Sequence, residues 1–286
     1  MYDDLGLNVK WIYDPDEIFN AEKKEAQEQY LNNLTLNEIA NLIENKIESI
    51  RRLYIDNSID DSKHIGQGIE DLIEELKRAP EAGPPMYGKK INSITRGMRL
   101  GKLYLRSAAT GVGKTRSMVA DAVMCACDKI YDTKAGDWID VGIKQPALYI
   151  ATEQELDEVQ TMALAFLSCV DEEHILTGEY NFEEEDRVKY AAKLLQQSPL
   201  YVEYIPDFTL KDIENCIKRH IRMHGVQYFF YDYVHTSMKM LEDITRRSGG
   251  VRLREDNLLF LLSVKLKDIC TQFNVFILTS TQLNGD

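Results

Sequence analysis

Leu103-Tyr-Leu-Arg-Ser-Ala-Ala-Thr-Gly-Val-Gly-Lys-Thr115 is the segment that says most about the architecture of this chain. An apolar, strand-like run breaks into a turn of small residues, and an apolar helical stretch follows. This order of strand, tight turn and helix N-terminus predicts a phosphate-binding P-loop. Backbone N–H groups in such a turn form a concave anion site, and the unpaired N–H groups of the helix start add to it.

We expect this turn to hold a nucleoside triphosphate with Mg²⁺. Lys114 would reach the β- and γ-phosphates, and the Thr115 hydroxyl would hold the metal ion. The pattern G-x-x-x-x-G-K-[ST] is incomplete, because Ala108 stands where the first glycine is expected. A chance Gly-Lys-Thr at a helix start is the alternative, and the flanking strand and helix patterns favour the P-loop. The predicted phosphate-binding residues are Ala108, Ala109, Thr110, Gly111, Val112, Gly113, Lys114 and Thr115.

Length, charge and hydropathy limit the classes of protein to consider. The 286 residues suffice for one large domain with an appendage or for two smaller domains. No apolar run approaches the roughly 18–20 residues of a membrane span. The start, Met1-Tyr-Asp-Asp4, lacks the apolar core of a signal peptide, so we expect a cytoplasmic protein without membrane contact. A net charge of −13 argues against broad coating of nucleic acid, but it permits a local basic segment.

The cysteines and two histidines give a weaker signal. The five cysteines are not in C-x-x-C spacing and lie in apolar segments, which predicts small buried residues rather than a zinc or disulfide set. His220 and His224 are four residues apart on a predicted helix and could face one metal ion. Because no third ligand is evident in the sequence, a polar helix end is the favoured interpretation.

Periodicity divides the chain at Ala82-Gly-Pro-Pro85, a cluster of helix breakers. Residues 1–82 read as amphipathic helices, with helix starts at Asp14–Glu17 and Thr35–Glu38. In 83–286, apolar strands alternate with helices, which indicates an α/β fold with a mostly parallel sheet. Residues 131–146 form an unusually long connection between the helix after the P-loop and the next strand. The expected strands are 102–107, 147–151, 200–205, 226–231 and 275–280, and the expected helices are 114–130, 154–169, 183–197, 210–224 and 255–273.

Three further strands end in polar residues, where open α/β sheets bind ligands. Asp232 follows Phe229-Phe-Tyr and fits a Walker B acid that holds the Mg²⁺ shell. Glu153 follows Leu148-Tyr-Ile-Ala-Thr and is placed to polarise the attacking water, although a helix-start glutamate favoured by the dipole is the alternative. Gln282 ends the last strand, where an uncharged amide could contact the γ-phosphate.

Four arginines stand close together in this acidic chain, in Arg246-Arg-Ser-Gly-Gly-Val-Arg-Leu-Arg254. A mobile loop that contacts a phosphodiester backbone is one interpretation, and a solvated charged loop is the other. The DNA-binding candidates are Arg246, Arg247, Arg252 and Arg254.

Taken together, these segments resemble the C-terminal ATPase domain of the DnaB-type replicative helicases, in the RecA-like superfamily. The resemblance covers residues from about 85 to 286 and implies a RecA-like P-loop NTPase core preceded by a helical linker region. The segments that carry it are Gly97-Met-Arg-Leu-Gly101, Ala108 to Thr115, Tyr149-Ile-Ala-Thr-Glu153, Tyr231-Asp-Tyr-Val-His235 and Thr279-Ser-Thr-Gln-Leu-Asn284.

The resemblance implies an ATP-dependent DNA helicase subunit in which Glu153 is the catalytic base, Asp232 the Walker B acid and Gln282 the sensor that links nucleotide state to DNA. The implied cofactors are ATP and Mg²⁺. The implied partners are single-stranded DNA, further copies of the chain in a hexameric ring, and a primase or helicase loader.

Two other functions stay open at this point. The family carries further strands after the glutamine motif, with a DNA-binding loop and an arginine finger, whereas this sequence stops at Asp286. We therefore expect a truncated helicase, and a RecA-like protein that binds nucleotide or a partner without unwinding is the alternative. A small-molecule P-loop kinase is the third candidate, and the strand ending in Gln282 argues against it.

Overall fold

The computed structural model describes residues 35, 41, 44, 46–47, 64–78, 82–141, 144–247 and 254–282. The chain divides into two units between Ile73 and Glu74. Helix α4 (Ile69–Arg78) has acidic residues in its first turn and basic residues in its last, as the helix dipole favours. The predicted helix starts at Asp14–Glu17 and Thr35–Glu38 lie outside the described residues, apart from Thr35 itself.

A five-stranded parallel sheet forms the centre of the second unit, in the order β1-β7-β6-β4-β5. Five strands were expected in these places, and the structure confirms the α/β class. The strands are β1 (Leu103–Ala108), β4 (Ala147–Ala151), β5 (Leu200–Tyr204), β6 (Tyr228–Asp232) and β7 (Phe276–Gln282). Among the described residues, β1 and β5 each have a neighbouring strand on one side only.

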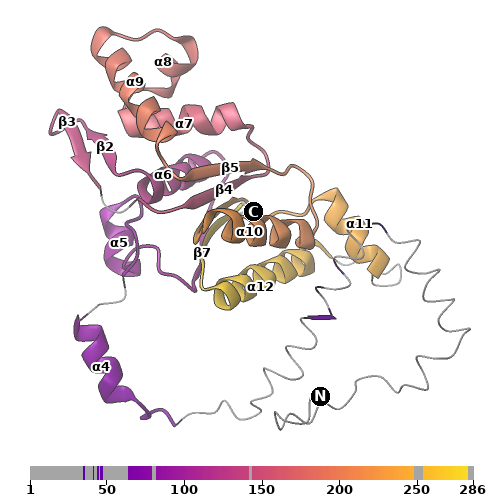
Figure 1. The fold of residues 1–286 in the computed structure, drawn as a ribbon. Helices are drawn as coiled ribbons and strands as arrows, with labels where there is room; N and C mark the ends of the chain where they lie inside the picture. The colour runs from indigo at the N-terminus through magenta and orange to yellow at the C-terminus, as the bar shows by residue number, and fades with distance from the viewer. Residues whose placement is uncertain are drawn as a thin grey trace, which may run out of the picture. The chain divides into compact units, whose positions relative to one another are not determined.

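Helices cover both faces of the sheet (Figure 1). One face packs against α6 (Lys114–Ala126), α7 (Leu156–Ser168) and α9 (Phe182–Gln196), and the other against α10 (Leu210–His224) and α12 (Glu255–Phe273). Side chains of β4 and β6 alternate between these two cores. Tyr149 and Phe230 enter the first, while Leu148, Phe229 and Tyr231 enter the second. Burial on both faces explains why these strands are continuously apolar.

Helix boundaries follow local capping chemistry. Thr209 and Asp212 form a capping box at the start of α10, because each side chain accepts a hydrogen bond from the other residue's backbone N–H. Gly225 ends the same helix in the left-handed conformation, at φ 64°. Both features lie at the ends of the helix expected at 210–224.

The structure corrects the expected connection at 131–146 and the expected end of the preceding helix. Helix α6 ends at Ala126, and a hairpin of β2 (Lys129–Asp132) and β3 (Asp137–Asp140) follows. An edge-to-face pair of Tyr131 and Trp138 joins the two strands, and Gly136 occupies the positive-φ position of the turn. Three short helices were also missed: α5 (Lys89–Thr95), α8 (Glu172–Thr177) and α11 (Met238–Arg247).

The cysteines are free thiols, as the sequence suggested, and four of them are buried. Cys169 is the exception to the expected burial, because it is the exposed C-terminal cap of α7 in the left-handed conformation. Among the described residues, no helix combines the length and apolarity needed to cross a membrane.

Candidate nucleotide site

The P-loop lies between the end of β1 and the start of α6. Gly111 and Gly113 adopt φ values of 79° and 86°, a region that favours glycine, and neither has an atom within 4 Å of where a Cβ would stand. The Lys114 ammonium folds over this turn and donates to the carbonyl oxygens of Ala108 at 2.8 Å and Ala109 at 2.9 Å. The turn is therefore an open cradle of backbone with a cation at its mouth, which suits a phosphate group.

Strand register brings the other candidate residues to the same end of the sheet. Ala108 of β1 pairs with Gln282 of β7, and Ala151 of β4 pairs with Asp232 of β6. Glu153 follows two residues after Ala151. Because all of these strands are parallel, the ends that carry Lys114, Asp232, Glu153 and Gln282 lie along one edge, where ligands bind in open α/β sheets.

Asp232 is the buried acid of the site, with 1% of its surface exposed. The Tyr149 hydroxyl donates to Oδ2 at 2.7 Å, and the Ser280 hydroxyl donates to Oδ1 at 3.3 Å. Burial, followed by the charge of Asp232, raises the pKa of Tyr149 well above its ordinary value, so this phenol remains a donor. The carboxylate is therefore fixed in direction by donors from β4 and β7.

Glu153 is exposed, and the Tyr233 hydroxyl donates to its Oε1 at 3.0 Å. Burial and then the hydrogen bond to Glu153 raise the pKa of Tyr233 to about 12. The backbone N–H and the hydroxyl of Thr152 both donate to the Asp232 carbonyl, at 3.1 and 2.8 Å. These bonds tie the ends of β4 and β6 together, so that Glu153 and Asp232 keep a fixed relation.

Gln282 is exposed at the end of β7, beside the first residue of the P-loop. The hydroxyls of Ser107 and Thr281, one residue earlier on each strand, lie 2.9 Å apart. The amide of Gln282 can thus turn toward a ligand, while its strand is joined to the P-loop strand.

Arg106 and Asp121 form a buried contact under the P-loop that sequence reasoning missed. Arg106 donates to the Asp121 carboxylate and to the Ser117 hydroxyl, each at 2.6 Å. Asp121 is fully buried and also accepts the backbone N–H of Tyr87 at 2.6 Å. This network fastens α6 to β1 on either side of the phosphate-binding turn. Its only sequence signals are Arg106 in a strand segment and Asp121 within the otherwise apolar run Met118–Ala126.

The arginine segment is partly helical rather than wholly a loop. Arg246 and Arg247 end α11, where the apolar residues Met240 and Ile244 pack into the core. Arg254 is the residue that caps the start of α12. Arg246 pairs with Asp243 and Arg254 with Asp256, each at 3.1 Å, and both arginine side chains are more than 80% exposed. Arg252 lies outside the described residues.

The sheet is parallel, a P-loop follows β1, and acidic residues stand at the ends of β4 and β6. Together these features define a RecA-like P-loop ATPase fold. The chain matches the family "DnaB-like helicase C terminal domain" over residues 85–286, and it belongs to that family. The SPbeta prophage-derived uncharacterized protein YorI of Bacillus subtilis (strain 168) is 38% identical over 284 residues. The match covers 99% of this chain and 56% of YorI, so the chain spans about half the length of this curated relative.

Two solved structures share the fold. One is an ATPase domain that superposes with a TM-score of 0.58 at 14% identity, covering 78% of this chain and 72% of that one. The other is a DnaB-like replicative helicase, described together with its interactions with primase, which gives a TM-score of 0.60 at 14% identity. That match covers 87% of this chain and 58% of the helicase chain.

Proposed function

We propose that this chain is a subunit of an ATP-dependent DNA helicase that couples ATP hydrolysis to unwinding. The observation that carries the proposal is the convergence of Lys114, Glu153, Asp232 and Gln282 on one edge of the sheet, with the register that holds them there. Membership of the DnaB-like family supports the reaction class.

The P-loop residues fit a bound triphosphate. The open backbone at Gly111 and Gly113 leaves room for phosphate oxygens, and Lys114 would exchange the Ala108 and Ala109 carbonyls for them. The chemistry that Mg²⁺ supplies when bound is neutralisation of charge on the β- and γ-phosphates. Thr115 would hold that ion directly, and Asp232 would hold water molecules of its shell.

Hydrolysis then depends on the side chains around the γ-phosphate. Glu153 orients the attacking water and accepts its proton, while the Tyr233 hydroxyl holds the carboxylate in place. Lys114 stabilises the charge that develops on the phosphate oxygens. Gln282 contacts the γ-phosphate and passes its presence along β7 to DNA-binding segments.

We propose the same partners that the family resemblance implies: single-stranded DNA, identical subunits in a hexameric ring, and a primase or helicase loader. The interactions with primase named for the similar helicase structure support the choice of primase. We also propose a boundary near residue 82, with a helical region at 1–82 and the ATPase domain at 83–286. The family match that begins at residue 85 supports this position.

The test uses the purified chain with forked and single-stranded DNA. DNA-stimulated ATP hydrolysis and strand displacement are measured together, with Lys114→Ala as the matched control. Stimulated hydrolysis with displacement supports the helicase. Nucleotide binding with neither activity would replace it by the binding-only alternative, and phosphate transfer to a small acceptor would replace it by a kinase.

A further inference from the structure

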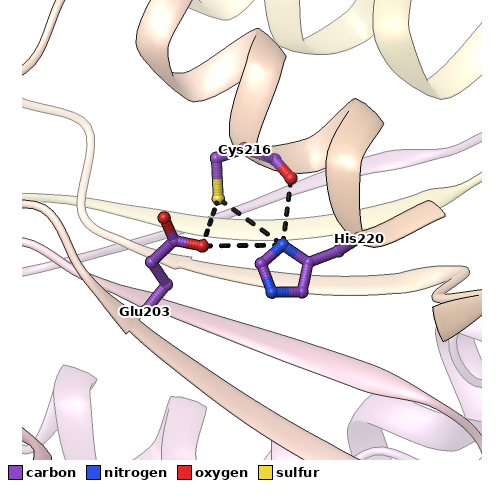
Figure 2. Close-up of side chains that lie close together, drawn as sticks. All are labelled: Glu203, Cys216 and His220. Atoms are coloured by element: carbon purple, nitrogen blue, oxygen red, sulfur yellow. Dashed lines mark hydrogen bonds and ion pairs between the residues drawn. The ribbon is translucent and has the colours of Figure 1, made fainter. Parts of the chain in front are cut away.

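Three side chains that can bind metal meet between β5 and α10: Glu203, Cys216 and His220 (Figure 2). Strand β5 lies at the opposite end of the described strand order from the P-loop strand β1. The Cys216 thiol donates to Glu203 Oε2 at 3.3 Å. His220 Nδ1 lies 3.5 Å from the same oxygen and 4.0 Å from Cys216 Sγ. Three different metal-ligating side chains therefore direct their ligand atoms to one point.

Two elements with regular spacing create this arrangement. Cys216 and His220 are four residues apart on α10, so they share the helix face that packs on the sheet. Glu203 lies on β5, the strand beneath that face. Cys216 is 2% exposed, while the side chains of His220 and Glu203 are 12% and 26% exposed. The cluster is held by the core on one side and can be reached by solvent on the other.

The separations match those of a tetrahedral zinc site. Ligands at zinc bond lengths of about 2.0–2.3 Å stand about 3.3–3.8 Å apart in a tetrahedron. The three observed separations of 3.3, 3.5 and 4.0 Å lie within about half an ångström of that range.

We propose that Glu203, Cys216 and His220 bind one Zn²⁺ ion, with the fourth coordination position open to water. Thiolate, imidazole and carboxylate are the ligand types that zinc takes in proteins. The thiolate and the carboxylate together carry the two negative charges that balance the ion. His224 stacks on Tyr201 with ring centroids 4.2 Å apart and is not one of the three converging ligands.

Zinc binding requires the Cys216 thiol to release its proton to solvent. Burial, followed by the charge of Glu203, raises the pKa of this thiol above its ordinary value, so the metal-free protein holds the proton. On His220, the Nδ1 atom that contacts the Cys216 carbonyl at 3.0 Å becomes the zinc ligand, and the ring proton resides on Nε2. No oxidant or other reactant is needed.

A bound zinc ion would lie close to the positively charged side chain of Arg219. Its guanidinium contacts both oxygens of Glu203. With zinc on Oε2, Arg219 keeps Oε1 and orients the carboxylate, as outer-shell partners do in metal sites. The bound ion would then join strand β5 to α10.

The first test is titration of the untagged, chelator-treated protein with Zn²⁺ alone, followed by calorimetry, and with Co²⁺, followed by absorption. We expect one equivalent to bind, with the thiolate-to-cobalt charge-transfer band and the strong visible bands of a tetrahedral site. Saturation without a thiolate band, or no binding at micromolar metal, overturns the proposal.

Variants locate the ion. Cys216→Ser, His220→Gln and Glu203→Gln should each weaken Zn²⁺ binding at least as much as the roughly 10–100-fold that loss of an outer-shell partner costs. Glu203 is partly exposed, so its variant serves if the buried Cys216→Ser does not fold. Cys169→Ser and His174→Gln remove an exposed thiol and an exposed imidazole elsewhere and should bind as the parent does. Loss of binding in either control, with retention in Glu203→Gln, places the ion elsewhere and overturns the site.

Discussion

The Lys114 ammonium has two carbonyl partners within its own loop. These bonds keep the cation at the mouth of the turn, so a phosphate that arrives meets a charge already in position. Asp232 is held in a similar way by Tyr149 and Ser280. At the scale of single residues, the candidate site is therefore ordered by its own protein contacts, which is the condition for strong electrostatic stabilisation.

We expect Lys114→Ala to weaken ATP binding by at least about 10–100-fold, because a hydrogen bond to a charged group contributes about 1.5–3 kcal/mol. A fluorescent ATP analogue titrated into both proteins measures the change. Lys102→Ala is the matched control. Lys102 is exposed and directly precedes β1, at the end of that strand away from the P-loop. Equal affinity in Lys114→Ala and the parent would remove the P-loop assignment.

Glu153→Gln should leave nucleotide binding unchanged and slow hydrolysis by about 10² or more, as expected for loss of a general base. The amide still accepts the Tyr233 hydroxyl, so the geometry is kept while the basic oxygen is removed. Single-turnover hydrolysis by the parent and the variant gives the rate. Asp157→Asn, an exposed acid in the next helix, is the control. A normal rate in Glu153→Gln with a slow rate in Asp157→Asn would move the base to Asp157.

At the scale of elements, local sequence patterns predicted most strands and helices of the second unit, Glu74–Asp286. The strands at β4 and β5 and the helices at α10 and α12 lie within one residue of their expected positions. The β2–β3 hairpin was missed because its strands are only four residues each and pack through Trp138 and Tyr190, a contact between distant segments. For the same reason, no local pattern could predict the Arg106–Asp121 pair or the Tyr149–Asp232 bond.

For the candidate site, too, only the part that depends on local sequence could be predicted. Strand ends could be read from the sequence, and so the positions of Asp232, Glu153 and Gln282 at one edge could be anticipated. Tyr149 lies on β4 and contacts Asp232 of β6, and Tyr233 directly follows β6 and contacts Glu153 after β4. These contacts depend on the order of the strands in the sheet, which hydrophobic periodicity along the chain does not give. The roles of these residues in catalysis stay predictions.

Replacing Arg246, Arg247, Arg252 and Arg254 with alanine should weaken binding of single-stranded DNA and flatten its salt dependence. The expected change is up to roughly 0.7 log–log units for each phosphate that the variant no longer neutralises. Arg246 and Arg254 are available for this role, because both guanidinium groups are more than 80% exposed, and ion pairs made by exposed groups contribute little energy. Fluorescence anisotropy over a series of salt concentrations measures the slope.

The control for this experiment removes four exposed lysines, Lys89, Lys90, Lys134 and Lys189, and so changes the net charge equally. It should leave the slope close to that of the parent. If both quadruple variants flatten the slope alike, the arginines act only through total charge, and the proposed contact with DNA is wrong.

At the scale of the whole second unit, we expect the stability to depend on a charge inside the core. Arg106→Met should lower the free energy of unfolding by about 3–5 kcal/mol, because Asp121 would remain buried without its cation. Urea unfolding of the parent and the variant gives this value. Adding Asp121→Asn should restore part of the loss, since the amide still accepts the Tyr87 N–H. A cost below about 1 kcal/mol would mean that water or a side-chain shift compensates the charge.

The place of β1 in the strand order has a consequence for amide hydrogen exchange. Strands β4 and β6 lie between neighbours and are buried along their whole length, whereas no residue of β1 is fully buried. Amides of β4 and β6 should exchange only through global unfolding, and those of β1 through a smaller local opening. Because the P-loop begins where β1 ends, ATP should slow deuterium uptake at 103–108 first, as seen by mass spectrometry. Deuterium uptake at 103–108 that is unchanged by saturating ATP would contradict this prediction. The strand that carries the phosphate-binding turn would thus report occupancy before the rest of the sheet responds.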